Sequence, residues 1–424
     1  MFLLLGVFLY SSNLENKYVS IFNIDEGSCS IKFKDIIKNT LGNHPSIMVS
    51  KEMLQSADKS IESAKWGYYP SPSIDYSYKN QNENSITFRV DQPIWTGGKL
   101  DAIYKKANSL KEEANSSLDE NRYKIIENNL KTLKSYLQAK NRLKVLDENI
   151  SDYKLLESML NRMMNAGVLS QADKNLLDSK ISILQTDILV TKSKLKVSKI
   201  QFEILTGKKI PCEIEFEYKS IFDENINIEK LVKSLSINHP SLNLIDSKIK
   251  KMIAELDETK SKIWPTLSLR AEHKDGALYK SSDDINENIA YLAISISPGA
   301  GLSAKSNIEK SKIEVNKVKY ERLSKEKELI DLLMSDYISF IKLKSGIKLL
   351  KNDISTAQQI YESNNRLFLS EKKSWLDVVN SLSEVSKYRI NYSEQNIEKE
   401  ILEYMLLLKS GQINLENFEV ISVL

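Results

Sequence analysis

The chain has 424 residues, 28% of them charged, and its formal net charge at pH 7 is only +3. With just 13 glycines and 8 prolines, few chain breakers interrupt long stretches rich in Lys, Glu, Leu and Ser. This composition favours long helices over compact α/β domains, and the interleaved charges argue against a nucleic-acid surface.

The N-terminus carries an apolar run from Phe2 to Leu9 that resembles the core of a secretory signal, although the usual basic residues before it are missing. We therefore expect residues 1–20 to be a signal segment. No other stretch approaches the roughly 20 apolar residues of a transmembrane helix, so any membrane insertion is expected through strands.

The chain contains the same unit twice. Asn43-His44-Pro45-Ser46 returns as Asn238-His239-Pro240-Ser241, and Ser170 to Asp173 aligns with Ser374 to Asp377. The period of about 200 residues is far longer than solenoid repeats, so a large unit is duplicated. We predict a first repeat over 21–207, an inter-repeat segment over 208–227, a second repeat over 228–411 and a tail over 412–424, with β-hairpins at about 72–93 and 266–298.

Each repeat is expected to hold one very long helix and shorter ones. Lys99 to Met164 contains no Gly or Pro, and its apolar residues return at three- and four-residue steps, the coiled-coil period. At 1.5 Å per residue, about 66 residues extend roughly 100 Å. The segments 44–66 and 170–206 together nearly match that length, which predicts two short helices along one long helix.

The hairpin segments alternate apolar and polar residues with a period of two, which places each set on one face of a sheet. A soluble sheet shows the same alternation. Charges opposite the apolar face favour a water-filled lumen behind a lipid-facing wall, and aromatic residues at the strand ends suit membrane interfaces. Four strands cannot close a barrel, so several subunits must pool them. The lumen candidates are Arg89, Asp91, Arg270 and Glu272, and the aromatic residues are Tyr68, Tyr69, Trp95 and Trp264.

Chemistry-bearing residues are sparse. Cys29 and Cys212 match no metal or redox spacing, so we expect a structural or incidental role for them. His44 and His239 each precede a proline in equivalent turns. This pattern predicts a helix boundary at each histidine rather than a metal site. With no nucleophile–base pair, metal cluster or cofactor motif in view, we expect neither catalysis nor a cofactor.

Taken together, these features resemble the TolC-like outer-membrane factor family, from about Phe33 to Gly411. The resemblance rests on the order and duplication of several motifs, since none is specific alone. They are the His-Pro-Ser segments, Tyr69-Pro70 and Trp264-Pro265 before the hairpins, Gln92 to Gly98 after the first hairpin, the turn from Gly167 to Asp173, and Leu205-Thr206-Gly207.

The resemblance implies a mainly α-helical homotrimer in the outer membrane, with a twelve-stranded transmembrane β-barrel continuing into a coiled-coil helical barrel in the periplasm. It further implies a passive conduit for secreted proteins, as in type I secretion, or for small toxic molecules, as in efflux. The implied partners are an inner-membrane transporter, either ABC-type or proton-driven, and a periplasmic adaptor.

The resemblance also implies a periplasmic tip that closes the pore. Asp377 matches an acidic residue at the pore entrance, and Asn380 stands where a second acidic residue is common. Lys373 matches a basic residue that bonds across the closed tip, with Asp173 as its acidic counterpart. Phe368 departs from the pattern, because a tyrosine that can donate a hydrogen bond is expected there.

Other interpretations stay open at this stage. Asp173 and Asp377 each lie three residues after a serine, the spacing of a helix-capping box, so they can serve as caps, as pore residues or as both. Two alternative functions for the whole chain are a periplasmic adaptor and a coiled-coil scaffold. An adaptor normally has one helical hairpin, and a scaffold does not need alternating strands. The exported cargo is not encoded in any recognisable motif.

Overall fold

The structure, a computed structural model, describes residues 29–79, 83–220, 222, 227–277, 284–296, 299 and 303–421. The expected signal segment and the end of the second hairpin segment at Ser297-Pro298 lie outside the described residues. None of the described helices carries an apolar stretch long enough to cross a membrane.

The elements repeat along the chain with matching lengths, which confirms the duplication. The helices α2 and α6 have 11 residues each, α3 and α7 have 22 each, and α4 and α8 have 67 each. The order is β1 (Ser30–Lys32), α2 (Phe33–Asn43), α3 (Pro45–Trp66), β2 (Ser71–Lys79), β3 (Glu83–Trp95), α4 (Lys99–Asn165), α5 (Gln171–Thr206), β4 (Glu213–Glu215), α6 (Ile228–Asn238), α7 (Pro240–Ser261), β5 (Thr266–Ala277), β6 (Asp284–Ser295), α8 (Ser303–Leu369) and α9 (Trp375–Lys409).

In space the chain divides into two compact units that cut across the repeats. Among the described residues, one unit comprises those up to His44, Arg122–Leu235 and those from Leu329 onward, and the other comprises those within Pro45–Asn121 and Ser236–Glu328. Each unit therefore takes residues from both repeats, and the repeat boundaries stay a division of the sequence.

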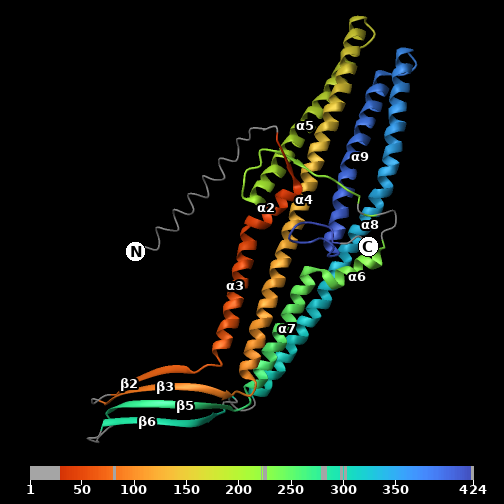
Figure 1. The fold of residues 1–424 in the computed structure, drawn as a ribbon. Coiled ribbons are helices and arrows are strands. Elements are labelled where there is room, and N and C mark those ends of the chain that lie inside the picture. The colour runs from red at the N-terminus through yellow and green to blue at the C-terminus, as the bar shows by residue number, and fades with distance from the viewer. Residues whose placement is uncertain are drawn as a thin grey trace, which may run out of the picture. The chain divides into compact units, whose positions relative to one another are not determined.

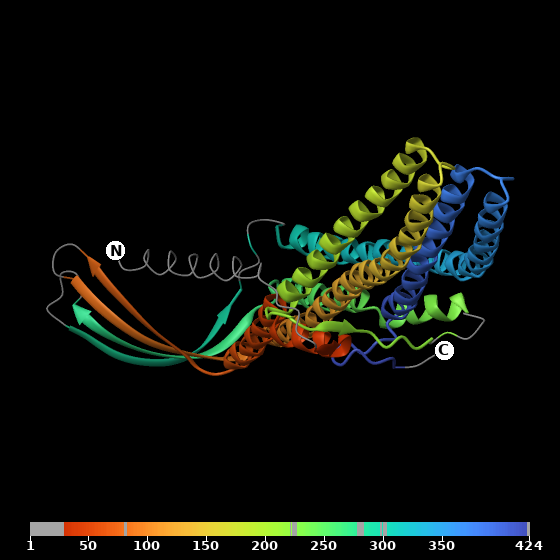
Figure 2. The same cartoon turned by 90° about the horizontal axis from the view of Figure 1, so that it is seen from above.

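The unit of Pro45–Asn121 and Ser236–Glu328 contains a four-stranded antiparallel sheet in the order β2-β3-β5-β6 (Figures 1 and 2). Pairing of β3 with β5 joins the hairpins of the two repeats, with Arg89 opposite Glu272 and Asp91 opposite Arg270. Among the described residues β2 pairs only with β3, and β6 only with β5. The sheet therefore has two free edges.

A glycine pair makes the bend between β3 and α4. Gly97 and Gly98 have φ of 59° and 82°, a region that favours glycine. At Gly97 an added Cβ would also lie 2.3 Å from Cβ of Trp264. Both the backbone conformation and the close approach of Trp264 therefore require glycine at this strand-to-helix bend.

Short helices lie along the long ones, as the helix lengths predict. In the unit that holds the sheet, α3 contacts α4, and the Asn121 amide donates to Oγ of Ser50 at 2.7 Å. In the other unit, α5 contacts α4 through an ion pair of Arg142 with Asp187 at 3.4 Å. His44 ends α2 and His239 caps the start of α7 by accepting from the Ser241 amide at 3.1 Å, which confirms both helix boundaries.

A disulfide joins Cys29 to Cys212, which are 183 residues apart in the sequence. It stands beside the parallel pair β1 and β4, in which Ile31 lies opposite Ile214. Phe33, next along the chain, is buried at the edges of three other phenylalanine rings, those of Phe202, Phe216 and Phe418. The expected structural role of the cysteines thus takes the form of a covalent bond between the start of the first repeat and the segment between the repeats.

We expect Cys29→Ser, Cys212→Ser and the double variant to lose the same amount of stability, on the order of 2–5 kcal/mol. A cross-link that closes a long loop restricts the unfolded chain, and losing either cysteine removes it. Thermal melts of the purified protein measure the effect, with reduced wild type as the control. Equal melting temperatures for wild type and the variants would contradict the prediction.

Candidate functional site

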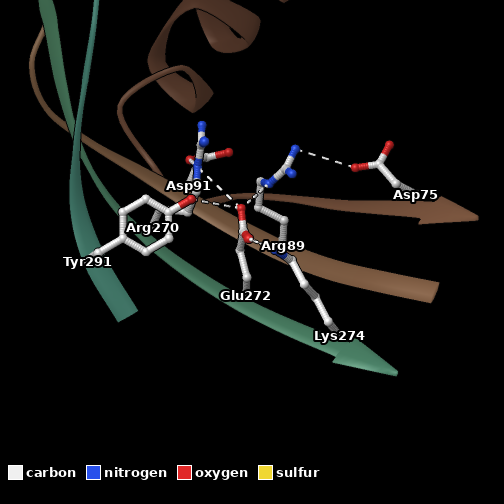
Figure 3. Close-up of polar contacts among 7 residues, drawn as sticks. All are labelled: Asp75, Arg89, Asp91, Arg270, Glu272, Lys274 and Tyr291. Atoms are coloured by element: carbon white, nitrogen blue, oxygen red, sulfur yellow. Dashed lines mark hydrogen bonds and ion pairs between the residues drawn. The ribbon is translucent and has the colours of Figure 1, made fainter. Parts of the chain in front are cut away.

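The polar face of the sheet carries a network of six charged side chains and one tyrosine (Figure 3). Strand alternation places them together, because register neighbours on adjacent strands point to the same face. Nε of Arg270 lies 2.6 Å from Oδ1 of Asp91. Arg89 bonds on one side to Glu272 at 2.8 Å and on the other to Asp75 at 3.4 Å. The network thus runs across β2, β3, β5 and β6.

Glu272 is the centre of this network. Its side chain is only 4% exposed, and it lies within 3.3 Å of Nζ of Lys274 and 3.9 Å of Nε of Arg270, besides its bond to Arg89. The Tyr291 hydroxyl donates to the same carboxylate at 3.0 Å. One carboxylate therefore contacts three cations. Its charge-assisted bond to Arg89 helps to fix the register of β3 against β5.

The structure brings the four predicted lumen candidates together, since Arg89, Asp91, Arg270 and Glu272 all belong to this network. It adds Asp75, Lys274 and Tyr291, which the sequence reasoning missed as members. Their strand alternation was a usable signal. Lys274 lies two residues from Glu272, Tyr291 lies opposite Arg270, and Asp75 lies opposite Thr87, which is two residues from Arg89.

The opposite face of the sheet is apolar, and no other described element covers it. Its residues include Ile74 at 68% exposure, Tyr76 at 62%, Leu292 at 62% and Ile294 at 76%. Contiguous exposed apolar surface of this kind marks a contact with lipid or with another protein.

Aromatic side chains gather where the strands meet the helices. Trp66 and Tyr69 contact each other with ring centroids 5.2 Å apart, and Trp95 and Trp264 are about half exposed at 48% and 55%. The Tyr68 hydroxyl donates to Oδ1 of Asp101 at the start of α4, at 2.7 Å. Each ring therefore has an exposed apolar body, as amphipathic residues at an interface do.

The second group of predicted residues lies at the turns between α4 and α5 and between α8 and α9. Ser170 with Asp173, and Ser374 with Asp377, both form capping boxes. Hydrogen bonds from Ser374 hold the pKa of Asp377 below its usual value, with a small contribution from nearby Lys373. The capping alternative is therefore realised in both turns.

The remaining tip residues show local contacts. Lys373 lies 4.0 Å from Oδ2 of Asp377 in its own turn, and no ion pair joins it to Asp173 among the residues the structure describes. Asn380 is exposed on the first turns of α9. Phe368 is buried and packs against Trp375, with ring centroids 5.4 Å apart, so an aromatic contact stands where the family pattern has a hydrogen bond.

Polar contacts between the two helical hairpins were missed by the sequence reasoning. Arg142 on α4 binds Glu394 on α9 at 2.5 Å and also Asp187 on α5. Arg389 on α9 binds Asp152 on α4 at 2.9 Å, and it also donates to Gln358 on α8 at 3.2 Å. We call these two sets the arginine clamps. An apolar cluster joins the same four helices and includes Leu146, Tyr153, Leu177, Phe368, Trp375 and Leu382.

The two turns share one backbone conformation but have different residues at the left-handed position. Gly167 and Glu371 both end a long helix with positive φ, 75° and 60°, and both donate their amide to the carbonyl three residues earlier at 2.9 Å. In this left-handed conformation a side chain crowds the following carbonyl at a cost of roughly 1–2 kcal/mol. The first turn avoids that cost and the second does not.

We therefore expect Glu371→Gly to stabilise the α8–α9 hairpin by about 1 kcal/mol, because the strain of the left-handed residue disappears. Gly167→Ala in the first turn should destabilise by a similar amount, and its added methyl group meets no atom within 4 Å, so strain alone is tested. Melting temperatures should move in opposite directions. Two shifts of the same sign would refute the assignment.

Comparison with known proteins supports the fold. No protein-family model and no curated protein matches the chain. Solved structures do: CusC, studied for its transmembrane channel formation, has a TM-score of 0.75 and 13% identity over 89% of this chain and 92% of its own. VceC of Vibrio cholerae, an outer membrane protein, has 0.74 and 12% over 89% and 96%. The MtrE outer membrane channel of Neisseria gonorrhoeae in its open state has 0.68 and 10% over 92% and 90%.

At such low identity the likeness concerns the fold. The chain has the fold of TolC-like outer-membrane channels, as the sequence resemblance predicts. Its mainly α-helical class with four strands from a duplicated unit is likewise confirmed.

Proposed function

We propose that this chain is one subunit of a homotrimeric outer-membrane channel that passively conducts exported substrates. The observation that carries the proposal is the sheet with an exposed apolar face, a polar face of paired charges and two free edges. Such a sheet suits a barrel wall between lipid and water, once the edges are joined.

The strand directions support closure by identical copies. Successive strands of the sheet are antiparallel, so the edge strands β2 and β6 run in opposite directions. The β6 strand of one copy can therefore pair antiparallel with β2 of the next, and a ring of copies closes without a free edge. Three copies give twelve strands, the number that the family resemblance implies.

The helices offer a matching surface. On α5 the aliphatic residues Ile183, Val190, Val197 and Ile204 recur every seven residues and are exposed by 57%, 47%, 53% and 55%. A heptad of exposed aliphatic residues is the surface that a neighbouring helix covers in a coiled coil. In the proposed trimer, a helix of the next copy covers it.

The setting follows from the same proposal. The disulfide suits an exported protein, because such bonds persist outside the reducing cytosol. The barrel lies in the outer membrane and the helices in the periplasm, where an adaptor and an inner-membrane transporter of the ABC or proton-driven class supply the substrate and the energy. The protein itself performs no catalysis. Its cargo is a secreted protein or a small toxic molecule.

The two competing functions are less well supported. A periplasmic adaptor normally has one helical hairpin, whereas this chain has two, α4 with α5 and α8 with α9. A coiled-coil scaffold has no need of a sheet with one apolar and one charged face. Similarity to outer-membrane channel structures extends over about nine-tenths of the chain in each comparison above, at 89%, 89% and 92%.

The proposal is tested by cell fractionation together with gel migration before and after heating. We expect the protein in the outer-membrane fraction as a species that migrates differently once boiled, because a closed barrel resists detergent. Purified protein that stays soluble and monomeric without detergent would rule the proposal out.

A pair of neighbouring substitutions sharpens the test. Leu292→Arg on the apolar face, further from the strand end than Ile294, should reduce the inserted trimer, because an arginine facing lipid costs about 2–4 kcal/mol at the bilayer centre and less toward the interface. Ala293→Arg on the polar face is the matched control and should leave insertion unchanged. Equal tolerance of both substitutions, measured as heat-modifiable protein in membranes, would contradict a lipid-facing assignment.

A further inference from the structure

We propose that the charged network of the sheet makes the strand-lined part of the channel nearly indifferent to the charge of its cargo, and that Glu272 is the residue that sets this property. The inference rests on the proposed channel function. It concerns what the wall discriminates, and it assigns to Glu272 a role in selectivity besides its place in the sheet.

The first step is the charge balance of the network. Its acids are Asp75, Asp91 and Glu272, and its cations are Arg89, Arg270 and Lys274. The six formal charges cancel within each copy. Glu287, opposite Lys274 in register, adds one exposed acid toward the outer end of the face. A ring of such copies therefore presents paired charges with a small net value.

The second step is the unequal weight of the acids. Asp75 has one cation at 3.4 Å and its side chain is 63% exposed, so it lies at the margin. Glu272 contacts three cations at 2.8, 3.3 and 3.9 Å and is 4% exposed. Removing the charge of Glu272 leaves three cations against two acids, and it frees the cations from the acid that draws them together.

The third step is the range of the field. An unbalanced charge on the wall acts over about 8 Å at physiological salt and about 30 Å at 0.01 M. In a wide pore, salt therefore screens an unbalanced wall charge at high concentration, whereas at low concentration the charge acts on ions that pass through the pore. The salt dependence separates a wall charge from a change in pore diameter, which would alter the conductance at every salt concentration.

The experiment compares variants by the reversal potential of purified trimers in planar bilayers, in a KCl gradient centred near 10 mM. We expect Glu272→Gln to shift the potential toward chloride selectivity and Arg89→Gln to shift it toward potassium selectivity. The double variant should return close to wild type, because one charge of each sign is lost. The shifts should shrink at 1 M KCl. Any contribution from the helical tip is common to all variants and cancels in the comparison.

The outcomes are distinct for the two claims. Conducting variants whose potentials equal that of wild type at low salt would overturn the inference while the channel function stands. Wild-type trimers that conduct no ions would count against the channel function itself.

A folding control keeps the test decisive. Should Glu272→Gln fail to form heat-modifiable trimers, Asp75→Asn removes one acid at the exposed margin of the same network. We expect a smaller shift toward chloride in that variant. No shift at low salt would again overturn the inference.

Discussion

Backbone hydrogen bonding at the edges of one small sheet is the constraint on which the rest of this molecule depends. Strands β2 and β6 each have one side with no partner among the described residues, and the apolar face beside them is uncovered. In hydrocarbon each unsatisfied backbone group costs several kcal/mol, and in water the apolar face is costly. One copy alone satisfies neither medium, and this is the physical reason why the proposed channel joins several copies.

The duplication explains how one chain supplies this sheet. Each repeat contributes one hairpin, and the pairing of β3 with β5 joins them into four strands. Arg89 and Glu272, 183 residues apart, bond across that junction. The long helices of the two repeats have equal lengths, so each hairpin is followed by the same span of helix. The duplication in the sequence thus produces a regular four-stranded sheet with an equal length of helix after each hairpin.

Local periodicity made much of this fold predictable. Long helices, strand faces and the doubled unit follow from spacing that a reader of the sequence can measure, and the capping serines at Ser170 and Ser374 are local signals too. The lumen candidates were found for the same reason, since alternation alone assigns each residue to a face. The similarity of the fold to outer-membrane channels confirms the fold class, while the lumen role of these residues stays a prediction.

Pairings between distant residues were not predictable, because a face can be inferred from spacing but a partner depends on three-dimensional register. The bond between Cys29 and Cys212 and the arginine clamps belong to this class. The conformation of Glu371 was hidden for a different reason: its equivalent is a glycine, and nothing in a glutamate signals a left-handed residue. Asp173 and Asp377 each accept a hydrogen bond at the start of their own helix. In the proposed channel, a role at the pore entrance would use the part of each carboxylate that does not take part in capping.

The arginine clamps have a mechanical consequence. Each guanidinium binds a residue of its own hairpin and a residue of the other: Arg142 reaches Asp187 and Glu394, and Arg389 reaches Gln358 and Asp152. Pulling one hairpin aside therefore strains bonds that also hold its companion in place. The two helical hairpins are therefore mechanically coupled, and a force applied to either hairpin is distributed over all four helices.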